Sequence, residues 1–483
     1  METDTANQND EVIDFQWQNA TGTVRWNHIF GDKLFMNLSG VYSNYNYGLN
    51  SSSTEGGGPG SVSGIFYWNS RINTFVLKPD FTFYPQVNQT WRFGLHTTHY
   101  RFLPAQVTTQ EKGINDTRFE TEIGIEIAPY FEVEQKWERT TLLLGLRYSW
   151  FGNFGPNEIF YYPKGVAKNV NTASHSKTFS SGEIIKSFGN FEPRLSLKYS
   201  INNRHRLRFG IDRNLQYLHL ISNTEVALPF DLWKPAGEHI TPLEVWQTTV
   251  GWATNDAENK WLISADIYAK RFRGLIEYKN GADLFLNNRI ETQLLPAQGY
   301  AYGLELSANK TKGKLQGEVN YTFARTLRHT TNPQGQENIN QGNDYPSNFD
   351  RPHILNLTAN YTLGKKWQAN LGFTFQSGRP YSATIGQFQL KNRWLLAYSN
   401  RNAYRLPPTH RLDLSLSYQP RKNKTNKRWK NTWNFGVYNL SGAKNPFTRF
   451  AQIDTSNAIP SLRHYQFSVI GAPIPFINYN FKF

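Results

Sequence analysis

Residues 474–483 of this 483-residue chain read IPFINYNFKF. Counted back from the last residue, every second position is large and apolar: Phe483, Phe481, Tyr479 and Ile477. The residues between them are polar: Lys482, Asn480 and Asn478. Successive side chains of a β-strand point to opposite faces, so the stretch predicts a strand with one apolar and one polar face.

The same alternation recurs along most of the chain. Two further apolar faces show it clearly, one made of Leu412, Leu414, Leu416 and Tyr418, the other of Leu195, Leu197 and Tyr199. No convincing amphipathic helix is visible. The pattern predicts about seventeen strands, near residues 21–30, 33–45, 65–83, 90–103, 119–136, 139–151, 190–200, 205–219, 244–254, 259–272, 300–310, 314–327, 352–362, 367–377, 410–419, 430–440 and 465–483.

The composition indicates a membrane β-barrel. Aromatic residues make up 15% of the chain, whereas its mean hydropathy is −0.60. No apolar run approaches the ~18 residues that a spanning helix needs. A transmembrane barrel alternates lipid-facing and interior positions and carries aromatic girdles at both interfaces. We therefore expect an all-β, antiparallel transmembrane barrel whose apolar faces contact lipid.

The net charge and the absence of cysteine restrict which metals and binding partners the chain can have. The chain has no cysteine, which excludes disulfides and cysteine-ligated metals. Its net charge of +15 fits either a solvated Lys/Arg-rich surface or attraction to lipopolysaccharide and anionic solutes. No basic helix or nucleic-acid-binding module is visible, so no nucleic-acid partner is expected.

The predicted connections alternate between short and long. Short turns lie inside and long loops outside in outer-membrane barrels, so the last strand would end on the periplasmic side. Counting back, residues 21–30 would run inward, and residues 1–20 would form an external N-terminal segment before a barrel at 21–483. The first residues show no secretory signal. An odd strand count departs from the usual even number, so we expect the chain to begin within a larger barrel.

Six stretches carry a family resemblance. They are YGLEL (302–306), FDRPH (349–353), QSGRPYS (376–382), RLPPTHRLDLSLSY (405–418), WNFGVYNLSGAKNPF (433–447) and IPFINYNFKF (474–483). Their order and spacing resemble the C-terminal part of TonB-dependent outer-membrane receptors of the Bacteroidetes type. The resemblance implies a 22-stranded barrel filled by an N-terminal plug, which the TonB complex pulls. Neither the plug nor the first strands are visible, so the resemblance implies a truncated receptor that needs a supplied plug to work with TonB.

The terminal strand suggests an assembly signal. Outer-membrane barrels of this kind commonly end on Phe, and the barrel assembly machinery reads that end by strand pairing. We therefore predict that Ile477, Tyr479, Phe481 and Phe483 form the signal. The alternative is that a last lipid-facing strand needs this pattern in any case.

One predicted external loop, residues 378–409, is basic and aromatic. It contains no Asp or Glu, and its candidate ligand contacts are Arg379, Lys391, Arg393, Trp394, Tyr398, Arg401, Tyr404 and Arg405. Guanidinium groups bind carboxylate or phosphate, and aromatic rings can stack on sugar or catecholate rings. The loop could bind an anionic solute or lipopolysaccharide, or it could simply be a shielded basic loop.

No catalytic or cofactor site is expected. The chain lacks the common hydrolase, metalloprotease and phosphate-loop motifs, so we expect no enzyme and no cofactor. His96 and His99 are three residues apart and would face opposite sides of a strand, which disfavours a shared metal. Asp350, Arg351 and His353 are more consistent with structural pairing at the barrel rim than with ligand contact.

Three functions remain open from the sequence. The first is an outer-membrane receptor that binds a scarce nutrient, such as an iron chelate, a cofactor or an oligosaccharide, for TonB-dependent import. The second is a self-contained passive porin. The third is a soluble all-β carbohydrate-binding protein, which would bury its apolar faces between sheets.

Overall fold

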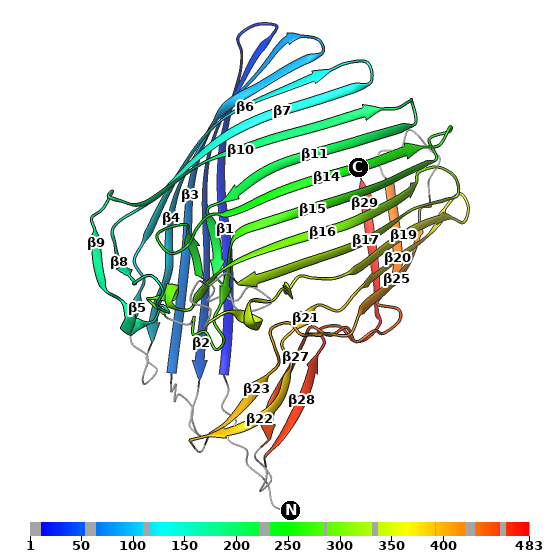
Figure 1. Ribbon diagram of the computed structural model, residues 1–483. Helices are drawn as coiled ribbons and strands as arrows, with labels where there is room; N and C mark the ends of the chain where they lie inside the picture. Colours follow the sequence, from blue (N-terminus) through cyan, green and yellow to red (C-terminus); the bar gives the residue numbers. More distant parts are fainter. Residues whose placement is uncertain are drawn as a thin grey trace, which may run out of the picture.

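Seventeen long antiparallel strands form one strongly curled sheet in the computed structural model (Figure 1). The structure describes residues 11–53, 64–109, 116–221, 232–284, 287–330, 337–391, 393–420, 430–454 and 460–482. In sheet order the long strands are β1 (Glu11–Ile29), β2 (Leu34–Ser53), β3 (Gly64–Gln86), β4 (Gln89–Thr109), β6 (Glu122–Lys136), β7 (Thr140–Phe154), β10 (Ile184–Ser200), β11 (His205–Gln216), β14 (Leu243–Asn255), β15 (Trp261–Tyr278), β16 (Leu294–Lys310), β17 (Leu315–Thr330), β19 (His353–Thr362), β20 (Trp367–Gln376), β25 (Thr409–Tyr418), β26 (Lys430–Tyr438) and β29 (Ile474–Lys482). Two short strands, β5 (Thr117–Arg118) and β18 (Tyr345–Pro346), extend the same sheet.

The strand register gathers the apolar side chains into continuous rows. Leu416 is paired with Phe435, and Phe435 with Ile477, so three strands share one apolar row. The neighbouring row on the opposite face is polar and contains Ser417 and Asn434. This arrangement confirms the period-two prediction for these strands.

The apolar faces are the exposed ones. On β25, Leu414 and Leu416 are 38% and 44% exposed, whereas Ser415 between them is half-buried. Leu197, Tyr199 and Ile477, also predicted to face lipid, are exposed as well. A soluble sandwich would bury such residues between its sheets, so this pattern is typical of a barrel whose outer face contacts hydrocarbon.

Aromatic side chains line the short-turn end of the exposed face. Four of them are direct cross-strand neighbours in the order Trp367, Tyr418, Trp433 and Tyr479. The rings of Trp367 and Tyr418 lie 4.7 Å apart, and those of Trp433 and Tyr479 lie 4.6 Å apart, between centroids. Amphipathic rings of this kind are the expected girdle at the interface between membrane and water.

The connections predicted to be long lie at the opposite end of the sheet, whereas the long connection between β25 and β26 belongs to the turn end. The former carry small hairpins and 3₁₀ turns, whereas the turns at the other end are mostly short (Figure 1). The loop elements are β8 (Asn157–Tyr161), β9 (His175–Phe179), β12 (Leu218–Ile221), β13 (Leu232–Pro235), β21 (Pro380–Tyr381), β22 (Thr384–Leu390), β23 (Arg393–Tyr398), β24 (Tyr404–Arg405), β27 (Thr448–Asp454), β28 (Ser461–Phe467), η1 (Val170–Thr172), η2 (Ile290–Thr292) and η3 (Ile339–Gly342). No helix in the described part of the chain is long and apolar enough to cross a membrane.

Several element boundaries differ from the prediction, and two of the differences concern the first and last strands. β1 already begins at Glu11, so strand pairing includes part of the segment expected as an external N-terminal stretch. The predicted last strand at 465–483 is two elements, because residues 465–467 belong to β28 and β29 begins at Ile474. Gly471 and Pro473 lie between them, and both residue types favour a change of chain direction.

The two end strands each have one neighbour. Within the residues that the structure describes, β1 pairs with β2 and β29 pairs with β26, and no ladder joins β1 to β29. β1 enters from the loop end, whereas β29 finishes at the turn end (Figure 1). This topology agrees with the predicted strand directions.

The main hydrophobic core lies inside the loop end. Its most buried members are Trp68 on β3, Val107 on β4 and Ile221 on β12, with at most 1% of their surface exposed. Residues of the external loops, including Leu232 and Ile290, pack against them. The inner wall therefore holds the loops in fixed positions, which places the candidate site.

Candidate ligand site between two external hairpins

Two external hairpins meet at the loop end of the sheet. β22 pairs with β23 and β27 pairs with β28, and Figure 1 shows both hairpins extending away from the barrel strands. The side-chain amide of Gln387 on β22 donates a hydrogen bond of 2.6 Å to the carbonyl of Pro460. Arg379 donates to the carbonyl of Phe447, so the two loops are also joined near their bases.

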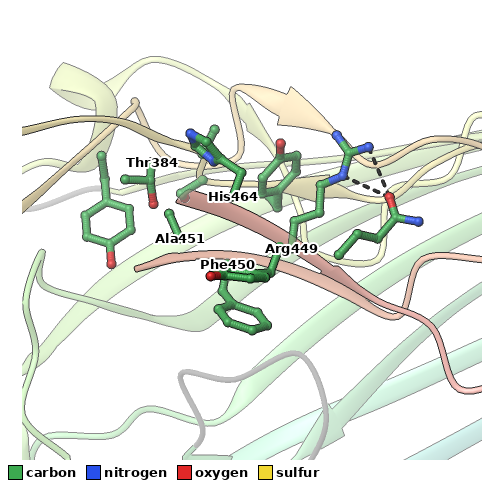
Figure 2. A pocket seen from close by; sticks show the side chains of 11 residues that line it. Thr384, Arg449, Phe450, Ala451 and His464 are labelled. Atoms are coloured by element: carbon green, nitrogen blue, oxygen red, sulfur yellow. Dashed lines mark hydrogen bonds between the residues drawn. The ribbon is translucent and has the colours of Figure 1, made fainter. Parts of the chain in front are cut away.

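A cavity of about 540 Å³ lies between the two hairpins. Figure 2 shows Thr384 from the first loop beside Ala451 and His464 from the second. The complete lining is Tyr381, Ser382, Ala383, Thr384, Tyr398, Arg449, Phe450, Ala451, His464, Tyr465 and Gln466. The cavity thus depends on both loops being in place.

The register of the second hairpin explains the polar wall of this cavity. Arg449 is paired with Gln466 and Ala451 with His464, so these four side chains share one face. Arg449 donates from Nε and one terminal nitrogen to Gln466 Oε1, at 3.2 and 3.1 Å (Figure 2). Gln466 therefore orients the guanidinium and occupies only part of its five donors.

The lining has the chemistry of a site for an anion that carries rings. Among the eleven lining residues there is no carboxylate, whereas Arg449 supplies a permanent positive charge. Tyr381 and Tyr398 supply rings and hydroxyl groups, and Ser382 and Thr384 add further hydroxyls. The charge favours an anionic ligand, and the rings allow stacking.

Arg401 is held by the barrel wall. Its guanidinium donates to Glu277 Oε1 at 2.5 Å and to Asn280 Oδ1 at 3.0 Å. The side chain of Glu277 is 8% exposed, and it also accepts a hydrogen bond of 2.9 Å from the Tyr345 hydroxyl. Burial and the adjacent Glu277 carboxylate raise the pKa of Tyr345. This ion pair gives Arg401 a structural role in fixing its loop.

Arg405 is also engaged in a buried ion pair. It donates to the carboxylate of Asp350, whose side chain is fully buried, and to the carbonyl of Gly378 at 3.0 Å. Asp350 additionally accepts from Arg325 Nε at 3.3 Å and from the backbone N–H of Thr326 at 2.6 Å. These contacts confirm the predicted structural pairing for Asp350.

The remaining predicted loop residues do not converge on one point. Lys391, Arg393 and Trp394 lie at or beside the exposed tip of the β22–β23 hairpin. Tyr398 lines the cavity and is 60% exposed, whereas Tyr404 pairs with Tyr381 at the base of the loop. Among the eight predicted contacts, Tyr398 is the one that lines this cavity.

Near the base of the loop, the guanidinium groups of Arg379 and Arg351 lie close enough to interact electrostatically. Arg351 follows Asp350, and burial together with the nearby Arg379 guanidinium lowers the pKa of Arg351. His353, at the start of β19, lies with its Nδ1 2.9 Å from the hydroxyl of Tyr321. The predicted rim pairing of His353 is therefore with a neighbouring strand.

The second wall of the cavity consists of residues that were not predicted from the sequence. Arg449, His464 and Gln466 lie in a long loop that has no unusual charge, so composition did not single them out. Alternation of residues 448–454 and 461–467 around a connection would have been the available signal for a hairpin. Even that signal would not have predicted which other loop it faces.

The part of the chain that the structure describes contains no group of three or more metal-ligating side chains. His96 and His99 lie on β4, where strand alternation places them on opposite faces. The structure therefore gives no support to a metal site at these two residues.

Comparison with known protein families decides the identity of the barrel. Residues 2–440 match the family profile described as TonB dependent receptor-like, beta-barrel. The chain belongs to this family. A comparison with curated protein sequences finds no match. Family membership and the exposed apolar faces favour the receptor over the passive porin and the soluble carbohydrate-binding protein.

Solved structures of TonB-dependent receptors share the fold of this receptor barrel. The ferric yersiniabactin uptake receptor FyuA from Yersinia pestis is 13% identical, with a TM-score of 0.58 over 99% of this chain and 63% of that one. The pyoverdine outer membrane receptor FpvA from Pseudomonas aeruginosa is 11% identical, with a TM-score of 0.61 over 97% of this chain and 62% of that one. The ferric citrate transporter FecA is 12% identical, with a TM-score of 0.57 over 97% and 62%.

These findings place the receptor barrel in the outer membrane, where members of the family act as transporters that work with TonB. The chain spans about 63% of the length of the first matched receptor. At such low identity the structural likeness concerns the fold alone.

Proposed function

We propose that this barrel forms the outer wall and the external binding face of a receptor that imports a scarce anionic chelate. The observation that supports the proposal is the cavity between the two external hairpins. Its lining combines a guanidinium, several hydroxyls and tyrosine rings, and it includes no carboxylate. Such a lining disfavours cations and attracts anionic ligands with flat rings.

The substrate class follows from this lining and from the family. Matched receptors are named for ferric yersiniabactin, ferric citrate and ferric catecholates. An anionic iron chelate with catecholate or carboxylate groups would satisfy Arg449 through charge-assisted hydrogen bonds and could stack on Tyr398. We propose this class ahead of a cofactor or a neutral oligosaccharide.

Energised import is the second part of the proposal. In a receptor that also carries a plug, the TonB complex would drive the release of ligand through the barrel. The proposed role of this chain is to present the ligand at the loop end and to enclose the path. The terminal residues Ile477, Tyr479, Phe481 and Phe483 are proposed to guide assembly. Ile477, Tyr479 and Phe481 lie on the exposed face, and Phe483 lies outside the described residues.

The test is ligand binding and uptake by the complete receptor. Ferric citrate and a ferric catecholate would be titrated against the detergent-purified receptor while tryptophan fluorescence is followed. Arg449→Ala should weaken binding by about tenfold or more, because a charge-assisted contact contributes more than ~1.4 kcal/mol. The matched control is Arg393→Ala, at the exposed hairpin tip, which should bind like the unmodified receptor.

Uptake separates binding from transport. Cells that depend on this receptor should grow on the chelate that binds in vitro, and growth should require an intact TonB complex. Equal binding of the chelate by the Arg449→Ala and Arg393→Ala receptors would show that the cavity between the hairpins is not the ligand site. Growth without TonB would favour passive diffusion.

A further inference from the structure

The outward face of β1–β3 changes character towards the loop end. Closer to the turns this face is apolar and exposed, with Val24 at 77%, Tyr42 at 52% and Phe75 at 52%. Beyond Tyr42 the same face carries mainly Asn and Gln side chains. The cross-strand pairs Gln18–Asn46 and Asn44–Asn73 belong to this amide face. An amide face has no favourable contact with hydrocarbon, so it lies outside the lipid.

Gly48 is the centre of a hollow in this amide face. Its cross-strand partners are Gln16 on β1 and Asn69 on β3. Its neighbours on the same face of β2 are Asn46 and Asn50. A cavity of about 410 Å³ lies here, lined by these residues together with Gln18, Tyr67 and parts of Phe15 and Trp17. Because glycine has no side chain, the surrounding amides form the rim of the hollow.

The opposite face of β3 is packed beside the hollow. Trp68 and Ser70, which alternate with Asn69, are 0% and 1% exposed, and Trp68 belongs to the inner core of the loop end. Trp68 Nε1 donates to the Ser70 hydroxyl at 2.8 Å. The hollow shares no lining residue with the cavity between the hairpins, and its central residues Asn46, Gly48 and Asn50 lie on the outward face of β2.

Three amide oxygens at the hollow have unused hydrogen-bonding capacity. Oδ1 of Asn46, Asn50 and Asn69 is buried, and none of the three accepts a hydrogen bond within the described structure. By contrast, Asn44 donates to Asn73 Oδ1 at 2.5 Å one row away. Buried amide groups normally find partners, so each of these three oxygens can accept a hydrogen bond once its amide turns towards the hollow, where Arg71 is the cross-strand partner of Asn46.

We propose that the hollow around Gly48 binds the hydroxyl groups of a saccharide. Amides offer both donors and acceptors, which matches the paired donor and acceptor character of sugar hydroxyls. Rotation of the Asn46 and Asn50 amides towards the ligand would give their oxygens the donors they lack. Tyr67, which is 41% exposed, supplies an apolar surface with a polar tip beside them.

The height of the hollow fits a saccharide layer at the membrane surface. Gly48 lies six residues beyond Tyr42 on β2, or roughly 20 Å along the strand at 3.3 Å per residue. The sugar groups of lipopolysaccharide occupy the layer outside the hydrocarbon of the outer leaflet. A free oligosaccharide has the same chemistry, so the experiment must distinguish these two sources.

The test uses the complete receptor in detergent and two soluble probes. One probe is the core oligosaccharide released from lipopolysaccharide by complete deacylation, and the other is maltohexaose. Binding is followed by titration calorimetry. The variant Asn46→Leu/Asn50→Leu should weaken binding about tenfold or more, because it removes two amide contacts. Asn73→Leu, on the same face outside the hollow, is the matched control and should retain binding.

The outcomes are distinct. Binding of the core oligosaccharide supports a lipopolysaccharide contact, and binding of maltohexaose supports a free oligosaccharide. Absence of binding to both probes would overturn the proposal, as would equal binding by the double variant and the control. A second variant, Gln18→Ala at the exposed edge of the hollow, should also weaken binding, and it preserves the test if the double variant fails to fold. The Arg449→Ala receptor should bind the saccharide normally.

Discussion

Arg401 and Glu277 are 124 residues apart in sequence and join an external loop to the barrel wall through a 2.5 Å hydrogen bond. The Glu277 side chain is 8% exposed, so its charge needs partners. The hydroxyl of Tyr345 is a second partner of the carboxylate, and Nη1 of Arg328 lies 3.7 Å from Glu277 Oε2. Loop 378–409 is therefore fixed at its C-terminal base, whereas its β22–β23 hairpin projects outward.

Loss of Arg401 should release this loop. In Arg401→Leu, the buried Glu277 keeps Tyr345 and the more distant Arg328, and we expect a loss of about 2–3 kcal/mol in stability, since breaking a buried pair is costly. The measurement is the unfolding midpoint of the purified receptor in denaturant. Arg393→Leu, at the exposed tip of the same loop, is the matched control. Identical midpoints for the two variants would show that the ion pair contributes no stability.

Acid should destabilise the receptor through His219. This residue is 7% exposed on β12, outside the barrel strands, and its Nε2 has no hydrogen-bond partner within the described structure. Burial lowers the pKa of His219 from 6.5 to about 4, although a backbone hydrogen bond at Thr241 opposes the shift. The unfolded chain therefore binds this proton more readily than the folded one, so stability falls between about pH 6.5 and pH 4.

The free energy of unfolding should be about 3 kcal/mol lower at pH 4 than at neutral pH. Each unit by which the pKa of His219 differs between the folded and the unfolded chain corresponds to 1.36 kcal/mol. His219→Leu should flatten the pH dependence of the thermal unfolding midpoint between pH 7.5 and pH 4.5. His175→Leu, at an exposed histidine, is the matched control, and its unfolding midpoint should fall in acid as steeply as that of the unmodified receptor. A His219→Leu receptor that loses stability in acid as steeply as the control would place the titrating group elsewhere.

The barrel architecture could be predicted because each strand carries its own two-residue alternation. This local signal fixed the faces of β25 and β29 and the positions of the long loops. The start of β1 at Glu11 was missed because the apolar positions change face along this strand: Ile13, Phe15 and Trp17 lie on one face, whereas Val24 and Trp26 lie on the other. The split of 465–483 was missed because both pieces alternate on either side of the Gly471–Pro473 turn.

The candidate site was less predictable because its contacts are distant in sequence. Composition identified the basic loop, but the partners of Arg401 and Arg405 lie 124 and 55 residues away. Nothing in the local sequence shows that Glu277 and Asp350 neutralise these two arginines. The cavity itself needs Tyr398 and Arg449 from separate loops, and such pairings depend on how the sheet curls.

The terminal strand should contribute to assembly as well as to packing. Phe481 is 55% exposed on the lipid-facing side of β29, where it stacks on Tyr479 with 6.0 Å between ring centroids. Phe481→Ser should reduce outer-membrane insertion of the intact receptor, whereas its synthesis should be unchanged. Quantification of receptor in the outer-membrane fraction against total receptor measures this. Normal insertion would leave packing as the sole role of Phe481.

The outward direction of the apolar faces can be tested with two neighbouring residues on β25. Leu414 is 38% exposed and Ser415 points to the opposite, interior face, so the two positions differ mainly in their surroundings. An arginine facing the midplane of the bilayer costs roughly 2–4 kcal/mol, whereas an interior arginine can stay hydrated. Leu414→Arg should therefore lower the amount of assembled receptor, measured as the heat-modifiable band in gel electrophoresis. Ser415→Arg should assemble nearly normally. Equal assembly of the two variants would contradict the lipid-facing assignment of Leu414 and of Leu371 and Val437, the two positions paired with it.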